Sequence, residues 1–256
     1  MKKILYEKAG EVVTITINRP ESLNAVDLEA YQEFSNALIE FRDDDEALVA
    51  IVTGSGEKSF SAGFDLTTLD ATKPFPVGLG PTIMRGLDLW KPVIAAVNGM
   101  ALGGGLEILA ACDLAIACEE AVFGTPEVAW GLIPGWGGTQ RLPRTIPKKK
   151  AAELLIMGTS IDASEAYRIG LVNKVVPRAE LMNTAMQWAT TICKKGSHAV
   201  QAVKEAMNRG LDTTLEEGLE LEIQLEQKLW ETDDAKEGFQ AFIEKRKPRY
   251  NRGVKK

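Results

Sequence analysis

The sequence contains very little histidine: His198 is the only one among 256 residues. It opens a helical pattern far from the glycine-rich centre of the chain, where nothing resembles a catalytic partner, so a solvated position fits it better than catalysis. Zinc sites that need several histidines are excluded, and a triad of serine, histidine and acid is disfavoured. We expect no metal site, and the chemistry must come from other side chains.

Cysteine is also scarce. Cys112, Cys118 and Cys193 are an odd number without the spacing of a metal site, which is typical of reduced thiols in a cytosol rather than of a disulfide framework. The amino terminus reaches Glu7 and Lys8 before any apolar stretch long enough for a signal-peptide core. We therefore expect a cytoplasmic protein.

The sequence has neither a long apolar run nor an excess of positive charge. Its least polar segment, residues 93–118, carries Asn98, Glu107 and Asp113, which makes it a poor membrane span. Lys and Arg number 30 against 36 Asp and Glu, whereas a nucleic-acid-binding domain is normally basic on at least one face. We expect a small ligand, and neither a membrane nor a nucleic acid, as the partner.

The first two thirds of the chain alternate strand and helix patterns. Residues 11–20 alternate like a strand, residues 27–43 have apolar side chains at helical spacing, and a buried strand follows from residue 48. The same order recurs with a strand from residue 92, a helix after the glycines and a strand from residue 114. Such alternation predicts an α/β core with parallel strand pairings.

The last third has a different pattern. Asp162 and Glu165 resemble a capping pair for a helix that ends at Gly170, and one more strand follows. Strand signals then stop, and the helical segments lie near 179–195, 198–209, 214–231 and 233–246. An apolar stripe that includes Leu215 and Leu219 must pack on the core or on a neighbouring subunit. We predict a core over residues 1–195 and a helical region over 196–256.

Glu107 is the first candidate for catalysis. It follows three glycines and lies in a helical segment that is otherwise apolar, with Leu106, Ile108 and Leu109 beside it. Burying an unpaired carboxylate is costly. Glu107 could instead face solvent or cap a neighbouring backbone, but its apolar flanks favour a functional role.

The glycines at 103–105 have two interpretations. Ile108 replaces the third glycine of a dinucleotide fingerprint, and no phosphate-loop Lys-Ser/Thr pair follows. One interpretation is tight packing of the turn. The other is a close approach of the backbone to a ligand at a helix amino terminus, where free N–H groups favour an oxyanion.

A second glycine-rich segment spans residues 54–66. Glu57 stands where a phosphate loop would have glycine before Lys58, so that motif is absent. Small residues at 61–63 follow a buried strand and would leave the next backbone N–H groups accessible, which could supply a second donor. Taken by itself, the segment is only a loop.

Glu127 is the second candidate. It follows Pro126 and has Val128, Ala129 and Trp130 after it. A desolvated carboxyl group has a raised pKa, as a general acid or base requires. Capping of a helix after Pro126 is an equally open interpretation from this segment.

Taken together, these segments resemble the crotonase superfamily, also called the enoyl-CoA hydratase/isomerase family. The resemblance covers nearly the whole chain and keeps the family's order and approximate spacing. The matching segments are NRPESLNAV, IVTGSGEKSFSAGFDL, KPVIAAVNGMALGGGLEILAACDLAIA, FGTPEVAWGLIPGWGGTQRLPR, GLVNKVV and DDAKEGFQAFIEKRKP.

The resemblance implies a spiral core of repeated ββα units, a helical carboxy-terminal region used for trimerisation, and a homotrimer or homohexamer. It implies that the backbone N–H groups of Phe64 and Gly104 bind the thioester oxygen, and that Glu107 and Glu127 hold a water. Retention of both glutamates favours reversible syn hydration of an enoyl-CoA. No cofactor is implied beyond the coenzyme A moiety of the substrate.

The resemblance also implies a binding site for the coenzyme. The matching positions are Ala25, Lys58, Ala62, Phe64, Asp65, Leu66, Gly104 and Lys245, and Lys245 could act across a subunit boundary. Phe64, Leu106 and Trp136 depart from the residues frequent in the family, which affects the acyl pocket. The alternatives are a double-bond isomerase or a thioester hydrolase on the same scaffold, or an RNA-binding relative.

Overall fold

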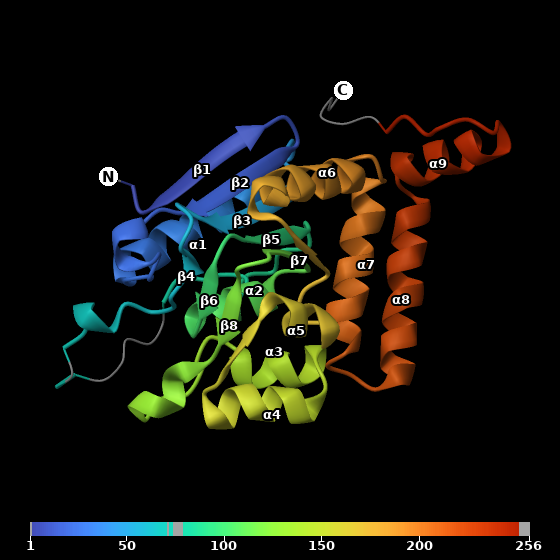
Figure 1. Ribbon diagram of the computed structural model, residues 1–256. Coiled ribbons are helices and arrows are strands. Elements are labelled where there is room, and N and C mark those ends of the chain that lie inside the picture. Colours follow the sequence, from blue (N-terminus) through green and yellow to red (C-terminus); the bar gives the residue numbers. More distant parts are fainter. Residues whose placement is uncertain (1, 71, 74–78, 251–256) are drawn as a thin grey trace.

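The computed structural model describes residues 2–70, 72, 73 and 79–250, which contain two β-sheets with helices around them (Figure 1). The larger sheet has the strand order β1-β2-β3-β5-β7-β10, and the smaller one has the order β4-β6-β8-β9. The strands are β1 (Ile4–Ala9), β2 (Val12–Ile17), β3 (Val49–Gly54), β4 (Ser59–Ser61), β5 (Val93–Val97), β6 (Met100–Leu102), β7 (Leu114–Cys118), β8 (Val122–Gly124), β9 (Ser160–Asp162) and β10 (Lys174–Val176).

From β3 to β8, successive strands alternate between the two sheets. β3, β5 and β7 lie in the larger sheet, and the strand after each of them, β4, β6 and β8, lies in the smaller one. Helices then return the chain, such as α2 (Gly104–Ala111) after β6. This repetition confirms the predicted α/β spiral of ββα units.

Local patterns in the sequence predicted neither β1 nor the strands of the smaller sheet, although the resemblance implied ββα units. The strands of the smaller sheet have three residues each, which is too short to show a period of two in a sequence. The prediction of parallel pairings holds for the neighbours from β2 to β10, but β1 pairs with β2 and β8 with β9 in antiparallel fashion. A two-residue turn suffices to join β1 and β2, and only an antiparallel pair can use so short a connection.

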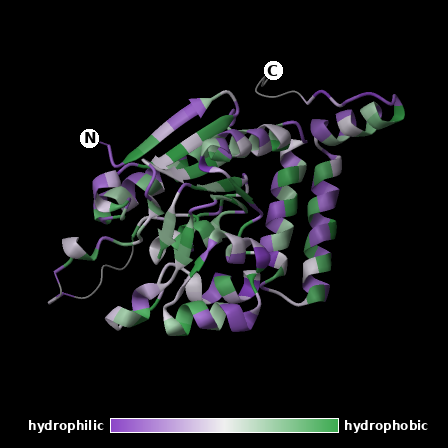
Figure 2. Cartoon of the chain, in the orientation of Figure 1, coloured by the Kyte–Doolittle hydropathy of each residue, from purple (hydrophilic) through white to green (hydrophobic). Residues whose placement is uncertain are grey.

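The hydrophobic core lies between the larger sheet and its helices. Every residue of β3 and β5 is buried, which explains their continuous apolar runs, and Figure 2 shows these central strands as hydrophobic. Helix α1 (Leu28–Asp43) begins where Asp27 Oδ1 accepts the N–H of Ala30 at 2.8 Å. It buries Tyr31, Phe34 and Leu38 on one face.

Three further helices flank β9 in the sequence: α3 (Gly138–Thr145) and α4 (Lys148–Met157) precede it, and α5 (Ala163–Arg168) follows it. The capping pair predicted for α5 is only half formed. Asp162 Oδ1 accepts the N–H of Glu165 at 2.8 Å, whereas the Glu165 carboxylate binds Lys150 and Arg168. Short 3-10 turns are η1 (Pro20–Ser22), η2 (Leu66–Thr68), η3 (Pro126–Trp130) and η4 (Arg178–Glu180).

The carboxy-terminal helices are α6 (Leu181–Cys193), α7 (Ser197–Gly210), α8 (Leu215–Trp230) and α9 (Asp233–Ile243), close to the predicted segments. Helix α6 packs on the larger sheet, and α7 and α8 run side by side at one edge (Figure 1). An ion pair of 2.7 Å between Lys204 and Asp113 ties α7 to the core. Large apolar side chains such as Leu215 and Phe242 remain exposed.

The boundary predicted at residues 195 and 196 falls between α6 and α7 and stays a prediction. His198 lies in the first turn of α7 with an exposed side chain, 3.3 Å from Asp234 Oδ2. Across the described residues, none of the helices combines the length and apolar character needed to cross a bilayer.

Candidate active site

Two glycines allow the loop after β4 to contact the start of α2. Gly63 has φ +89, and a Cβ there would lie 2.7 Å from the backbone nitrogen of Gly104. A Cβ on Gly104 would lie 2.6 Å from ring carbons of Trp136. Both distances are shorter than a Cβ atom tolerates. Glycine at position 63 therefore permits a backbone contact with Gly104, 41 residues later in the sequence, and glycine at position 104 leaves room for the Trp136 ring.

The contact of Gly63 with Gly104 brings two backbone N–H groups near each other: that of Phe64, the residue after Gly63, and that of Gly104 itself. Val26 pairs with the loop through the neighbours of Phe64: its N–H donates to Gly63 O at 2.7 Å, and its carbonyl accepts from Asp65 N at 3.0 Å. Because backbone groups alternate along an extended segment, the Phe64 N–H points away from Val26. Gly104 is the first residue of α2, where N–H groups have no intrahelical acceptor. Such a pair of donors is suited to an oxyanion.

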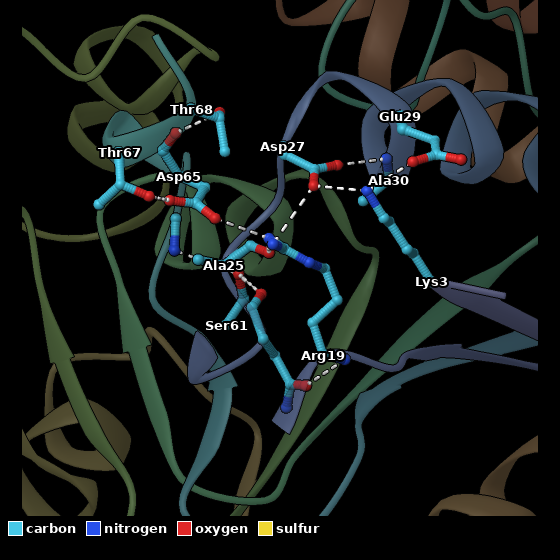
Figure 3. A network of polar contacts seen from close by, with 12 residues as sticks. Lys3, Arg19, Ala25, Asp27, Glu29, Ala30, Ser61, Asp65, Thr67 and Thr68 are labelled. Atoms are coloured by element: carbon cyan, nitrogen blue, oxygen red, sulfur yellow. Dashed lines mark hydrogen bonds and ion pairs between the residues drawn. The ribbon is translucent and has the colours of Figure 1, made fainter. Parts of the chain in front are cut away.

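Arg19 holds the loop that carries Phe64 (Figure 3). Its guanidinium forms ion pairs with Asp65 at 3.0 Å and with Asp27 at 3.3 Å, and it donates to the carbonyl of Ala25. The Thr67 hydroxyl donates to Asp65 at 2.6 Å. These bonds, the Thr67 bond first and the Arg19 pair after it, hold the pKa of Asp65 below its ordinary value despite burial. Arg19 was not among the predicted site residues, since one arginine in a loop has no distinguishing pattern in the sequence.

Glu107 lies in the first turn of α2 and is only 3% exposed. Its Oε1 atom accepts the N–H groups of Trp136 and Gly138, each at 2.7 Å. Gly138 is the first residue of α3, so the carboxylate sits at the amino terminus of another helix, where a negative charge is favoured. The interpretation that Glu107 faces solvent is therefore wrong. Glu107 does accept backbone N–H groups, but these belong to a segment distant in the sequence and not to a neighbouring one.

Glu127 lies in η3, and its side chain reaches the residue that precedes α2. Its Oε1 atom lies 3.1 Å from the position of a Cβ on Gly103, next to the start of α2. Its Oε2 atom is buried and has no hydrogen-bond partner among the described residues. A buried carboxylate oxygen without a partner is costly in a structural role and is expected where a substrate or water binds.

The two carboxyl groups have perturbed protonation. Burial raises the pKa of Glu107 to about 7, with the negative charge of Glu127 adding to the rise and the two N–H bonds opposing it. Burial also raises the pKa of Glu127. Close carboxyl groups titrate as a pair, so near neutral pH one ionised and one protonated group can coexist. The site can therefore supply a base and an acid together.

An aromatic cluster covers the site between α1 and the glycine contact. The Trp136 ring lies 5.8 Å from the Phe64 ring in an edge-on arrangement and 5.3 Å from the Tyr31 ring. Tyr31 is buried, and its hydroxyl is 3.2 Å from that of Thr82. The cluster forms an apolar wall beside the donors, and Tyr31 was predicted only as an apolar residue of its helix.

The structure brings most of the predicted site residues together. Glu107, Glu127, Phe64 and Gly104 meet around the start of α2, and Ala25, Ala62, Asp65 and Leu66 lie in the two adjoining loops. Lys58 is exposed just before β4. Lys245 is exposed just beyond the end of α9, and α9 lies far from β4 and β6 in Figure 1, so one chain does not bring Lys245 to the site. Among the described residues, no cluster of His, Cys, Asp and Glu could hold a metal ion.

Comparison with known proteins identifies relatives along nearly the whole chain. Residues 7–253 match the model of the family described as enoyl-CoA hydratase/isomerase. The chain is 45% identical to the short-chain-enoyl-CoA hydratase of Clostridium acetobutylicum, covering 96% of this chain and 97% of that protein. It is 42% identical to the crotonyl-CoA hydratase of Syntrophomonas wolfei, covering 97% and 98%.

Solved structures show the same fold. The crystal structure of an enoyl-CoA hydratase from Bacillus anthracis superposes with a TM-score of 0.89 at 39% identity, over 97% of this chain and 98% of that one. The spiral of paired strands, the glycine contact and the two buried glutamates are thus accompanied by similarity along almost the entire sequence. The chain belongs to the enoyl-CoA hydratase/isomerase family.

Proposed function

We propose that this protein is an enoyl-CoA hydratase, which adds water reversibly and in syn geometry across the 2,3 double bond of an acyl-CoA thioester. The observation that carries the proposal is the pair of buried carboxyl groups, Glu107 and Glu127, with raised pKa values beside two backbone donors. The names of the relatives in Clostridium and Syntrophomonas, both hydratases, support it.

The backbone donors act on the thioester. Its carbonyl oxygen accepts the N–H groups of Phe64 and Gly104, and these stabilise the enolate-like charge that develops as water adds. One such donor is often worth about 3 kcal/mol of transition-state stabilisation. The donors need a fixed geometry, which the Arg19 ion pairs and the contact of Gly63 with Gly104 provide.

The two glutamates move the protons. In the reacting state Glu127 carries the proton, so its charge no longer opposes the ionisation of Glu107, which two N–H groups also favour. Glu107 then takes a proton from water as the water oxygen bonds to C3. The π bond between C2 and C3 breaks, and Glu127 delivers its proton to C2. The product contains one added water, and the two carboxyl groups have exchanged protonation states.

The coenzyme A moiety of the substrate is the only cofactor in this proposal. Its contacts are assigned to Ala25, Lys58, Ala62, Asp65, Leu66 and Lys245, together with the donors Phe64 and Gly104. Lys245 would act from a neighbouring subunit of a homotrimer or homohexamer. The exposed apolar side chains on α7 to α9 support such an assembly, and light scattering on the purified protein would measure its mass.

The same proposal includes a role in β-oxidation and a cytoplasmic location, and the location is inferred from the free cysteines. It does not include binding of nucleic acid, because the chain is acidic. A salt-dependent shift of RNA mobility by a protein without hydratase activity would contradict this part.

The test is hydration of crotonyl-CoA, followed as loss of the enoyl absorbance in the wild type and in Glu107→Gln and Glu127→Gln. We expect turnover in the wild type and a large loss in both variants. Undiminished turnover in either variant removes that residue from the mechanism. Product analysis separates the alternatives, because a hydrolase frees the thiol and an isomerase consumes no water.

A further inference from the structure

A second half-buried arginine besides Arg19 is Arg141, which lies on α3 one turn after the residues that hold Glu107. Its guanidinium donates to three backbone carbonyls: Trp136 O at 3.2 Å, Ile83 O at 3.3 Å and Met84 O at 2.8 Å. One side chain therefore joins the segment before α3 to the segment of residues 83–84, although about fifty residues separate them in the sequence.

The segment that Arg141 holds is the one that holds Glu107. The N–H of Trp136 donates to Glu107 Oε1, while the carbonyl of the same residue accepts from Arg141. Gly137 between them has φ +113, and a Cβ on it would overlap the guanidinium. The backbone conformation that aims two N–H groups at Glu107 thus fits around the Arg141 side chain.

Arg141 differs from Arg19 in its charge balance. Arg19 is paired with two aspartates, whereas the hydrogen-bond partners of Arg141 in the described part of the chain are all carbonyls. Its positive charge is therefore available to Glu107, whose pKa it lowers against the effect of burial. The titratable groups that act on Arg141 are Glu107, Arg85, Cys112 and Asp212, and those that act on Glu107 are Glu127 and Arg141.

We propose that Arg141 is a positioning residue for the hydration: it holds residues 136–138 in the conformation that fixes Glu107, and its charge favours the ionised form that accepts the proton of water. This inference rests on the proposed function, since it assigns Arg141 a task in that reaction. It concerns kcat and its pH dependence rather than substrate binding, because Arg141 acts through the loop and not on the substrate.

The test compares Arg141→Met, Arg141→Lys and the control Arg144→Met in hydration of crotonyl-CoA, with kcat and KM measured across pH. Arg144 is an exposed arginine on the same helix. In Arg141→Met we expect kcat to fall on the order of 10²-fold, as for a misplaced catalytic group, with KM nearly unchanged. The acid limb of kcat/KM should move to higher pH, because loss of the cation disfavours ionised Glu107. Arg144→Met should match the wild type.

Arg141→Lys separates the effect of charge from that of hydrogen-bond geometry. It also tests the positioning role if Arg141→Met does not fold. Lysine keeps the charge but lacks the planar fork, so we expect the acid limb to stay in place while kcat falls about 10-fold. Wild-type kcat in Arg141→Lys would overturn the positioning role, and an unshifted acid limb in folded Arg141→Met would overturn the electrostatic role. A wild type that hydrates no enoyl-CoA refutes the proposed function itself, which is a different outcome.

Discussion

The two sides of the site hold their glutamates in different ways. On the α2 side, Glu107 Oε1 accepts two backbone N–H groups and the side chain is almost fully buried. On the η3 side, Glu127 has a buried oxygen without a partner among the described residues. The first carboxyl group is fixed by the fold, and the second keeps an unused acceptor. A site with one fixed and one unsatisfied carboxyl group is suited to orient a water with the first and transfer a proton with the second.

The largest effect should come from Glu127→Gln. If this residue is the proton donor, hydration of crotonyl-CoA should slow about 10³-fold, within the range for loss of a general acid. Stability should hardly change, because no hydrogen bond of its Oε2 atom is lost. Absorbance assays and urea unfolding measure the two quantities. Glu119→Gln, at an exposed position, is the control, and a large loss of stability in Glu127→Gln would contradict the contrast between the two sides.

The pH dependence of stability tests the α2 side next. Because the pKa of folded Glu107 is raised, its protonated form stabilises the protein fully below the ordinary pKa of 4.5, and this contribution is lost as pH rises through about 7. Over that interval the loss amounts to about 3 kcal/mol. Glu107→Gln should show a shallower decline in the free energy of unfolding than the wild type. Parallel curves would mean that Glu107 titrates normally.

Truncation to alanine should separate the two sides in stability. Glu107→Ala leaves the Trp136 and Gly138 N–H groups without their acceptor, and we expect a loss of about 2 kcal/mol in the free energy of unfolding at pH 7. Glu127→Ala should cost clearly less, because its Oε2 atom has no hydrogen-bond partner in the described part of the chain. Urea unfolding of both variants measures the difference. Equal losses would show that the fold depends on both carboxyl groups alike.

The smallest effect concerns the aromatic wall. Trp136→Ala removes the ring beside Gly104 and Phe64 but keeps the N–H that holds Glu107. We expect hydration to persist and the kcat/KM ratio of a ten-carbon enoyl-CoA to crotonyl-CoA to rise about 10-fold, as when a hydrophobic pocket is enlarged. Trp130→Ala, exposed on η3, is the control. An unchanged ratio would show that the ring does not limit the acyl group.

Much of the fold could be predicted because its main signals are local. The runs in β2, β3 and β5 and the cap of α5 at Asp162 follow from residues that are close in sequence. The smaller sheet could not be predicted, since strands such as β6 owe their pairing to partners far along the chain.

The sequence by itself determined the candidates: two glutamates among apolar residues, glycines that permit a close backbone contact, and motifs in the order of a known family. Only the tertiary structure decided how they act together. The packing of α2 against the start of α3 gives Glu107 its two donors and places Arg141 behind residues 136–138. Glu127 Oε2 is buried without a hydrogen-bond partner among the described residues. Burial and charge shift a pKa through space, so their effect on these carboxyl groups depends on contacts between segments that no local pattern in the sequence records.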